Sequence, residues 1–406
     1  MNRSSFSRKS GRHFLQIPGP TNVPDRILRA IDRPTIDHRS AEFARLGREC
    51  LEGMKPIFRM SSGHVFIFPG SGTGGWEAAI VNTLSAGDRV LMFETGQFAT
   101  LWRKVAESFG IIVDFVPGDW RHGIDPALVE ATLTEDPGHE IKAVMCVHNE
   151  TSTGITNRIG EIRHAMDAAK HPALLFVDAV SSLASSDYRH DEWRVDVTVA
   201  GSQKGLMLPP GLSFNAVSEK ALNASKTAGL PRAYWSWESM LEANTGGFFP
   251  YTPATNLLYG LREAILMLVS EEGLENVVRR HHRHGEATRR AVRAWGLELL
   301  CLEPREYSSS VTAVMTPEPF DETELRRIIL EQFDLSLGAG LGKVKGRVFR
   351  IGHLGDFNDL MLCGTLCGTL CGIEMGLDRL GIPVRKKGVT AAMEYLNRGD
   401  VPVQAN

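Results

Sequence analysis

The chain has 406 residues, of which 43% are hydrophobic, so it can bury a large core and form two or three domains. A net charge of −3 argues against nucleic acid or an anionic membrane as a partner, and no apolar run approaches the ~20 residues that span a bilayer. The six cysteines are unevenly spaced, so we expect reduced thiols in a cytoplasmic protein.

The first residues are predicted to form a flexible arm. Residues 1–14 are basic, serine-rich and free of acidic residues. The prolines of segment 16–24 exclude a helix interior, so this segment should be extended. We expect a short helix at 25–31, which Pro24 begins, and a longer helix at 41–59.

A glycine-rich loop follows a predicted strand at 65–68. Three glycines have the G-x-G-x-x-G spacing of a dinucleotide-binding loop: Gly70, Gly72 and Gly75. The next predicted strand, 89–93, ends in Glu94, where a ribose-binding acid would stand, so an NAD-dependent oxidoreductase is one interpretation. Against it, Pro69 separates the strand from the glycines. A Gly/Ser/Thr loop before a helix can also bind a single phosphate through its free N–H groups.

Strand and helix patterns then alternate as far as residue 212. Strands are predicted at 89–93, 111–116, 142–147, 173–178 and 195–200. Amphipathic helices are predicted between them, for example at 101–109 and 158–170. This alternation predicts an α/β fold with a mostly parallel sheet, in which ligands bind at the carboxyl ends of the strands.

A carboxylate and a lysine follow two of these strands. Asp178 closes a strand of buried type, and Lys204 lies in the small-residue turn 201–205 after the next strand. Pyridoxal phosphate requires such a pair, because a lysine forms its Schiff base and a carboxylate keeps its pyridine nitrogen protonated. On these residues alone, a turn cap at Asp178 and a solvated Lys204 fit the pattern equally well.

Three further features have polar or aromatic groups where a ligand would bind. Phe98 follows the strand that ends at Glu94 and could cover a flat ring, although a core aromatic fits as well. The hydroxyl- and amide-rich run 148–154 follows the strand at 142–147. Arg350 could hold a carboxylate with its fork of donors, or it could be a surface arginine.

The alternation stops beyond residue 212. Aromatic loops at 234–237 and 248–253 precede a helix at 256–271 that connects to a second domain. In that domain we expect helices at 274–295 and 321–333 and strands near 297–301, 311–315 and 347–351, which is an α+β layout. The predicted units are an N-terminal arm at 1–18, a large domain at 19–271 and a smaller α+β domain at 272–406.

A four-residue repeat spaces three cysteines four apart: Cys363, Cys367 and Cys371. On a helix this spacing puts the cysteines on one face. The pattern C-x3-C-x3-C matches no zinc or iron–sulfur spacing, so we expect a packing stripe and no metal site.

These motifs together resemble the class V (fold type I) pyridoxal-phosphate aminotransferases of the alanine/serine–glyoxylate group, most closely the serine–glyoxylate aminotransferases. The resemblance rests on PGPTNVP at 18–24, TIDHRS at 35–40, GTGGWEAA at 72–79, HNETSTG at 148–154, FVDAVSS at 176–182, GSQKGLMLPPGL at 201–212, YTP at 251–253, LLYGLREA at 257–264, EEGLENV at 271–277 and FRIGHLG at 349–355. The cysteine repeat departs from this family, which has one four-residue unit fewer.

The resemblance implies a pyridoxal 5′-phosphate site. Lys204 would form the Schiff base and Asp178 would pair with the ring nitrogen, while Phe98 stacks on the ring and Thr151 faces it. The phosphate would be held by Ser71, Gly72, Thr73 and Gln203, with Thr252 from the other subunit of a homodimer. Arg350 would bind the substrate carboxylate.

The resemblance also implies a reaction between small amino acids and 2-oxo acids. L-Serine, or else L-alanine or L-aspartate, would donate its amino group to glyoxylate, which becomes glycine, while serine becomes hydroxypyruvate and alanine becomes pyruvate. A desulfurase or lyase of the same fold would need a thiol on a mobile loop, and residues 303–346 contain no cysteine. The final residues, 404–406, are not a peroxisomal tripeptide, in keeping with a cytoplasmic setting.

Overall fold

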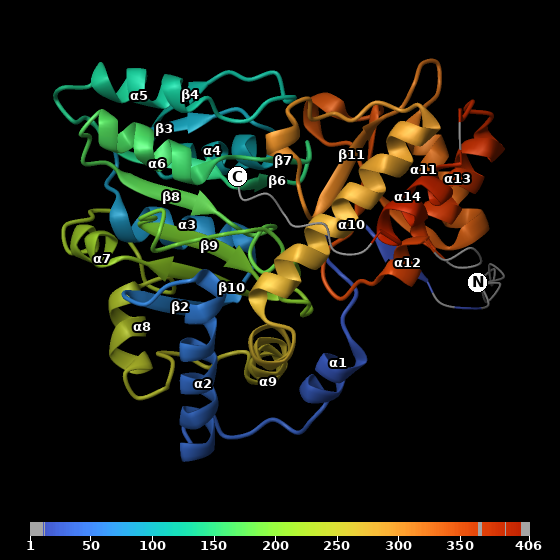
Figure 1. Ribbon diagram of the computed structural model, residues 1–406. Helices are drawn as coiled ribbons and strands as arrows, with labels where there is room; N and C mark the ends of the chain where they lie inside the picture. The colour runs from blue at the N-terminus through green and yellow to red at the C-terminus, as the bar shows by residue number, and fades with distance from the viewer. Residues whose placement is uncertain (1–10, 12, 364–367, 386, 399–406) are drawn as a thin grey trace, which may run out of the picture.

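The computed structural model describes residues 11, 13–363, 368–385 and 387–398. It has a larger part built around a central sheet and a smaller part with its own sheet, and helix α10 (Leu274–Trp295) runs from one into the other (Figure 1). In the described part of the chain, no helix is both long and apolar enough to cross a bilayer.

The central sheet has seven strands in the order β2-β10-β9-β8-β5-β3-β4. Their bounds are β2 His64–Gly70, β3 Arg89–Phe93, β4 Ile112–Val116, β5 Ile141–Val147, β8 Leu174–Asp178, β9 Val197–Gly201 and β10 Gly211–Val217. Strand β10 is antiparallel to both of its neighbours, and the strands from β9 to β4 are parallel. The predicted α/β fold with a mostly parallel sheet is confirmed.

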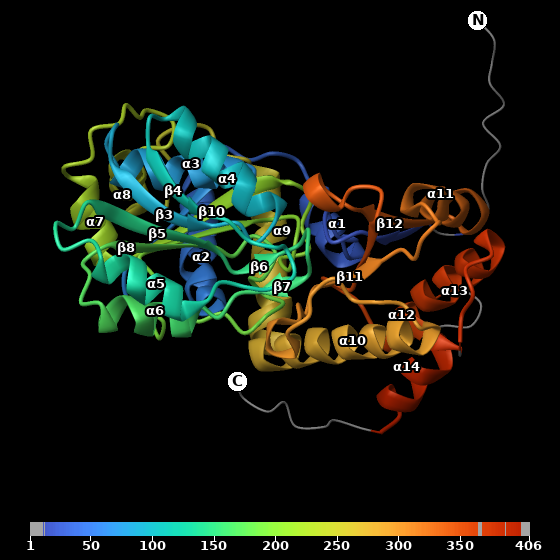
Figure 2. The same cartoon turned by 90° about the horizontal axis from the view of Figure 1, so that it is seen from above.

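Helices cover both faces of this sheet. Those of the larger part are α1 Asp25–Ile31, α2 Ala41–Phe58, α3 Gly72–Thr83, α4 Gln97–Ser108, α5 Pro126–Thr134, α6 Ile159–Ala168, α7 Glu219–Ser225, α8 Trp237–Asn244 and α9 Thr255–Ile265. Helices α3 and α4 lie on one face, and α5 and α6 lie on the other (Figure 2). Because both faces are covered, every residue of β8 and β9 is buried, and their sequences are nearly continuous apolar runs.

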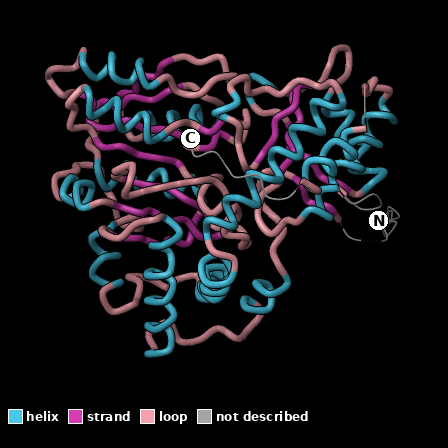
Figure 3. The backbone as a smooth tube through the Cα atoms, viewed as in Figure 1, coloured by secondary structure: helices cyan, strands magenta, loops and turns pink. Residues whose placement is uncertain are grey.

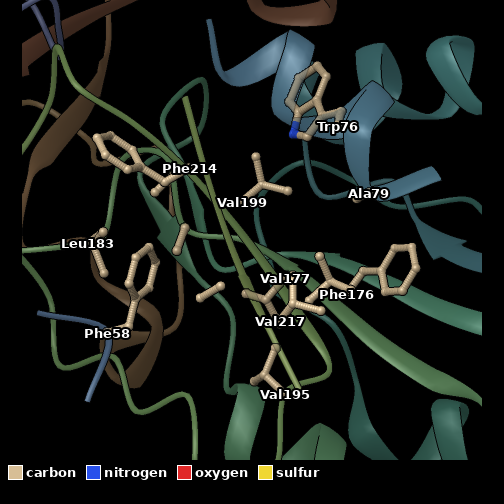
Figure 4. Close-up of a cluster of buried hydrophobic side chains, with 14 of the residues drawn as sticks. Phe58, Trp76, Ala79, Phe176, Val177, Leu183, Val195, Val199, Phe214 and Val217 are labelled. Carbon is tan, nitrogen blue, oxygen red and sulfur yellow. The ribbon is translucent and has the colours of Figure 1, made fainter. Parts of the chain in front are cut away.

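Aromatic and branched side chains fill the space between the layers. Phe58, Phe176 and Phe214 are buried within this core beside Val199 (Figure 4). On the α3 side, the Trp76 and Trp102 rings stack with centroids 5.8 Å apart. This packing fixes α3 and α4, whose first residues face the ends of the strands.

Strand β10 was not predicted, because its sequence places polar residues among apolar ones. Ser213 and Asn215 are fully buried. The Asn215 amide donates to the Gly75 carbonyl at 3.1 Å and accepts from Trp237 Nε1 at 3.2 Å. These long-range partners compensate the burial of the amide, and no local pattern could reveal them.

The smaller part contains a four-stranded sheet in the order β1-β12-β13-β11, apart from the central sheet (Figure 3). Its strands are β1 Phe14–Gln16, β11 Val311–Met315, β12 Leu335–Ala339 and β13 Val348–Gly352. Its helices, besides α10, are α11 Glu322–Phe333, α12 Asp359–Cys363, α13 Thr369–Leu380 and α14 Gly388–Leu396. Strand β1 pairs in parallel with β12, so three residues of the predicted arm extend this sheet. The rest of the arm up to residue 10 lies outside the described residues, and the boundary after residue 271 stays a prediction.

Three other segments differ from expectation. The predicted strand near 297–301 is reduced to an isolated bridge between Leu299 and Val314. The predicted helix at 256–271 is α9 continued by a π-helical segment, Leu266–Glu271. Cys363 ends α12 and Cys371 lies in α13, so a continuous helical stripe does not form, and Cys367 lies outside the described residues.

Candidate active site

A cavity of about 140 Å³ opens at the carboxyl ends of the parallel strands. It is lined by Ser71, Gly72, Thr73, Trp76, Phe98, Val147, Asn149, Thr151, Asp178, Val180, Ser181, Gln203 and Lys204. These residues come from the first turns of α3 and α4 and from the ends of β5, β8 and β9. All of the predicted cofactor-binding residues except Thr252 therefore meet here.

Asp178 stands at the end of β8 and is 4% exposed. Trp76 Nε1 donates to its Oδ2 at 3.1 Å, and the Val180 backbone N–H donates to its Oδ1 at 2.7 Å. Burial raises the pKa of Asp178 to about 7, and it outweighs the hydrogen bonds from Val180 and Trp76 and the charge of Lys204, which act in the opposite direction. The site thus presents a carboxylate whose ionised form is stabilised by a bound cation such as a protonated ring nitrogen.

Lys204 lies under the segment that leads from β1 into the larger part. Its Nζ donates to the Pro18 carbonyl at 2.5 Å. Gly19 has φ +94°, and a Cβ there would lie 2.6 Å from Lys204 Nζ, so this close approach requires glycine. Burial, assisted by the charge of Arg350 and opposed by that of Asp178, lowers the pKa of Lys204 to about 8. A much larger fraction of the amine is therefore neutral near physiological pH than in an ordinary lysine.

The first turn of α3 is suited to a phosphate. Ser71 is the N-cap but its side chain makes no capping hydrogen bond, and the first helical bond runs from Gly75 N–H to the Ser71 carbonyl. The N–H groups of the intervening residues are thus available to an anion at the positive end of the helix dipole. A Cβ on Gly72 would lie 2.7 Å from Val180 Cγ2, so only glycine fits beside the cavity wall.

Gln203 supports the same assignment. Within the described part of the chain, its buried Oε1 has no hydrogen-bond partner. Rotating the side-chain amide by 180° exchanges its oxygen and its nitrogen. In either orientation, one polar atom of Gln203 is left for a ligand. The residues present therefore fit pyridoxal phosphate: a carboxylate for the ring nitrogen, a lysine, an aromatic ring and a phosphate cradle.

Arg350 lies behind the cavity lining and not in it. It stands in β13 and is 7% exposed. Its Nε donates to the Ala339 carbonyl at 2.7 Å and its Nη1 to the Thr151 carbonyl at 3.0 Å. Burial lowers its pKa to about 10, so the guanidinium remains charged at neutral pH. Its predicted role as a carboxylate clamp stays a prediction.

Thr252 does not join the cavity of the single chain. It is exposed in the loop that follows Phe248 and Phe249, next to a surface hollow lined by His38, Arg39 and Phe248–Tyr251. Its predicted contact with the phosphate requires a second subunit.

The sheet order contradicts the dinucleotide-binding interpretation. In a dinucleotide-binding unit the two strands of the βαβ motif are neighbours, whereas β10, β9, β8 and β5 lie between β2 and β3. Glu94 is consequently far from the glycine loop in the sheet. It forms an ion pair with Lys343 at 2.5 Å and accepts from Trp120 Nε1 at 3.2 Å.

Several residues that line or support the cavity were missed by sequence reasoning. Trp76 lines it and donates to Asp178, while behind the lining Pro18 accepts from Lys204 and Glu150 accepts from the backbone of Phe98. Their motifs, GTGGWEAA, PGPTNVP and HNETSTG, were recognised. The local sequence does not indicate which residue of each motif contacts Asp178, Lys204 or Phe98.

Comparison with known proteins identifies the family. The family "Aminotransferase class-V" matches residues 13–341. The serine–glyoxylate aminotransferase of Methylorubrum extorquens is 49% identical over 396 residues, which cover 96% of this chain and 97% of that protein. The chain belongs to the class V aminotransferases. Pyridoxal 5′-phosphate is accordingly its cofactor.

Two further similarities bear on the substrates and the fold of this aminotransferase. The L-aspartate–glyoxylate aminotransferase of Paracoccus denitrificans is 46% identical over 389 residues, covering 96% of this chain and 97% of that protein. The crystal structure of pyridoxamine-pyruvate aminotransferase from Mesorhizobium loti matches with a TM-score of 0.86 at 27% identity, covering 97% and 99% of the two chains. The architecture is the fold type I arrangement.

Proposed function

We propose that this aminotransferase transfers the amino group of L-serine to glyoxylate, which yields hydroxypyruvate and glycine. Relatives named for serine and glyoxylate support the pair of substrates, and a relative of similar identity named for aspartate makes that amino acid the alternative donor. Alanine is a further alternative, giving pyruvate.

The charge of the cavity favours serine over aspartate. Among the described residues that line it, Lys204 is the single cation. With Arg350 behind the lining, the chain offers one clamp for one carboxylate, whereas aspartate brings two. Asn149, Thr151 and Ser181 add polar groups at the cavity wall that suit a hydroxyl. If a second subunit supplied Arg39 to the cavity, the added positive charge would favour aspartate as the donor.

Each polar residue then has a defined task. The bound cofactor serves as the electron sink for the charge that develops at the substrate α-carbon. Asp178 holds the proton on the ring nitrogen, which keeps that sink effective. Lys204 Nζ, neutral once its lowered pKa is exceeded, takes the α-proton as a general base and returns it as a general acid. Arg350 orients the substrate by its carboxylate.

A homodimer completes this proposal. The exposed position of Thr252, beside aromatic residues that include Phe248 and Tyr251, supports a contact with the phosphate of a partner subunit. Ser71 and Thr73 are also exposed in the single chain, so the phosphate cradle has an open side.

The decisive experiment is a panel of amino donors with glyoxylate as the acceptor, in which glycine formation is measured. We expect kcat/KM for L-serine to exceed that for L-aspartate by about tenfold or more, since an unpaired carboxylate is costly to bury. A preference for aspartate would overturn the donor, and no glycine with any donor would overturn glyoxylate as the acceptor.

A further inference from the structure

Glu150 is a fully buried carboxylate at the edge of the site, and no step of the reaction described above uses it. Its Oε2 accepts from the backbone N–H groups of Phe98 and Ala99, both at 3.0 Å. Its Oε1 accepts from the Ser152 N–H at 3.1 Å and from the Ser152 hydroxyl at 2.6 Å. Four donors therefore converge on one side chain.

The identity of these partners favours the ionised form. Three of the four are backbone N–H groups, which can only donate, and an ionised carboxylate accepts from all of them. The Ser152 hydroxyl oxygen accepts from the Gln97 N–H at 2.9 Å, which directs its hydrogen toward Glu150. Burial raises the pKa of Glu150, and the hydrogen bonds from Ser152, Ala99 and Phe98 act in the opposite direction.

Glu150 also replaces the missing cap of α4. The N-cap residue of that helix is Gly96, which has no side chain to satisfy the first N–H groups. A Cβ at Gly96 would lie 2.4 Å from Glu150 Cγ, so the glycine makes room for the carboxylate. The negative charge stands at the positive end of the helix dipole, where it is stabilised. The first turn of α4, with Phe98, is thus fixed from another segment of the chain.

The segment that carries Glu150 reaches the other side of the site as well. Its neighbours Asn149 and Thr151 line the cavity, and the Thr151 carbonyl accepts the hydrogen bond from Arg350 Nη1. The charge of Glu150 favours the cationic form of the buried Arg350.

We propose that Glu150 is a positioning residue, whose carboxylate holds Phe98 over the cofactor ring and fixes the adjoining backbone, where the Thr151 carbonyl accepts from Arg350. The inference rests on the predicted stacking role of Phe98, and it is independent of which amino acid is the donor. It distinguishes Glu150 from an ordinary helix cap, because it predicts an effect on the cofactor and on substrate binding.

The test is Glu150→Gln, which keeps the size of the side chain but turns an NH2 group toward donors. We expect the apoprotein to bind pyridoxal phosphate about tenfold more weakly in a fluorescence titration, because the first turn of α4 shifts. The visible circular dichroism of the bound cofactor should decrease, since it reports how the ring is oriented. KM for both acid substrates should rise about tenfold, and Glu150→Asp, which retains the charge, should recover part of each effect.

The matched control is Ser218→Ala, which removes the cap of α7, a helix whose residues do not line the cavity. It should lower the melting temperature and leave cofactor affinity and circular dichroism unchanged. If Glu150→Gln behaves like this control, Glu150 is a structural cap and the proposal is overturned. Should Glu150→Gln fail to fold, Ser152→Ala removes one of the four donors, the hydroxyl, and must show the same effects at smaller size. An altered preference between serine and aspartate would bear on the proposed donor and not on Glu150.

Discussion

Lys204 and Asp178 are two buried ionisable groups whose pKa values have moved toward each other. Burial lowers the pKa of Lys204 to about 8 and raises that of Asp178 to about 7. In both cases burial is the largest cause and it disfavours the charged form. Near neutral pH, a small change in surroundings therefore shifts the proton occupancy of either group, as acid–base catalysis requires.

The first prediction concerns the reactivity of Lys204 in cofactor-free protein. Amine reagents attack only the neutral form, so the rate of modification rises through the pKa of the amine. We expect a midpoint near pH 8, compared with about 10.5 for an ordinary lysine. The measurement is the pH dependence of Lys204 labelling followed by mass spectrometry, with Lys170 as the internal reference. A labelling midpoint for Lys204 at or above pH 10 would contradict the claim that burial lowers its pKa.

The second prediction concerns Asp178→Asn. The asparagine oxygen can still accept from the Val180 N–H and only the hydrogen bond from Trp76 Nε1 is lost, so the cofactor should remain bound. Turnover should fall by about 10- to 100-fold, the loss expected for one charge-assisted hydrogen bond to the ring nitrogen. The measurements are kcat and the cofactor content by absorbance, with Asp114→Asn, which disrupts an exposed ion pair, as the control. Near-normal turnover would remove Asp178 from the mechanism.

At the scale of elements, the site depends on how closely α3 packs on the sheet. A Cβ at Gly75 would lie 2.5 Å from Ser213 Oγ and 2.7 Å from Val199 Cγ1. The helix that carries the phosphate cradle can therefore approach β9 and β10 because of this glycine.

The third prediction follows from that contact. Gly75→Ala should lower the free energy of unfolding by ~1–3 kcal/mol, since an added methyl must displace packed neighbours. It should also weaken cofactor binding as α3 shifts. Urea unfolding and a cofactor titration measure both effects. Gly138→Ala is the control because the nearest atom to its Cβ would be 3.6 Å away. Equal stability of the two variants would show that α3 is less tightly held than the distances indicate.

The fourth prediction concerns Arg350, which β13 presents to the loop after β5. Arginine satisfies the Ala339 and Thr151 carbonyls with separate nitrogens, and Arg350→Lys offers one nitrogen for both. KM for serine and glyoxylate should each rise about tenfold or more, while cofactor absorbance stays unchanged. Steady-state kinetics with either substrate varied would show this. Unchanged KM values would place the carboxylate clamp elsewhere, with Arg39 as the next candidate.

The elements that the sequence predicted well are those whose evidence is local. The strand that ends at Asp178 and the helix at 274–295 have clear periodicities, and both lie where they were expected. Strand β10 was missed because Asn215 is satisfied by distant groups, and β1 because its three residues need β12 as a partner. Glu150 was missed for the same reason: its partners in α4, Ala99 and Phe98, lie 51 and 52 residues away in the sequence.

At the scale of the molecule, the two parts are joined beside the cavity by hydroxyl and amide groups. Ser186 and Ser309 share a hydrogen bond of 2.7 Å, and Asn149 Nδ2 donates to Ser310 Oγ at 2.9 Å. Ser310 directly precedes β11, which pairs with β13 so that Ala313 lies opposite Arg350. The contact thereby sets the position of Arg350 relative to the cavity.

The fifth prediction tests whether sites are shared between subunits. If Thr252 completes the site of its partner, a mixture of Lys204→Ala and Thr252→Val chains forms hybrid dimers with one intact site each. When the two weakly active variants are refolded together, random pairing makes about half of the dimers hybrids, and each hybrid has one intact site of two. The mixture should therefore recover about a quarter of wild-type activity. Lys204→Ala mixed with Asp178→Asn is the control, because those residues belong to the same site and no intact site can form. Absence of recovery in the first mixture, or an active monomer in sedimentation, would exclude the shared site.

The pairing of β1 with β12 has a consequence for biosynthesis. Phe14 is translated long before its partner Leu335, with most of the larger part between them in the sequence. Until then the segment through Pro18 and Gly19 has no sheet to anchor it, so Lys204 is without its cover while most of the larger part can already have folded. A nascent chain released before β12 is translated would therefore expose the lysine, and the site is covered only once β1 has paired with β12.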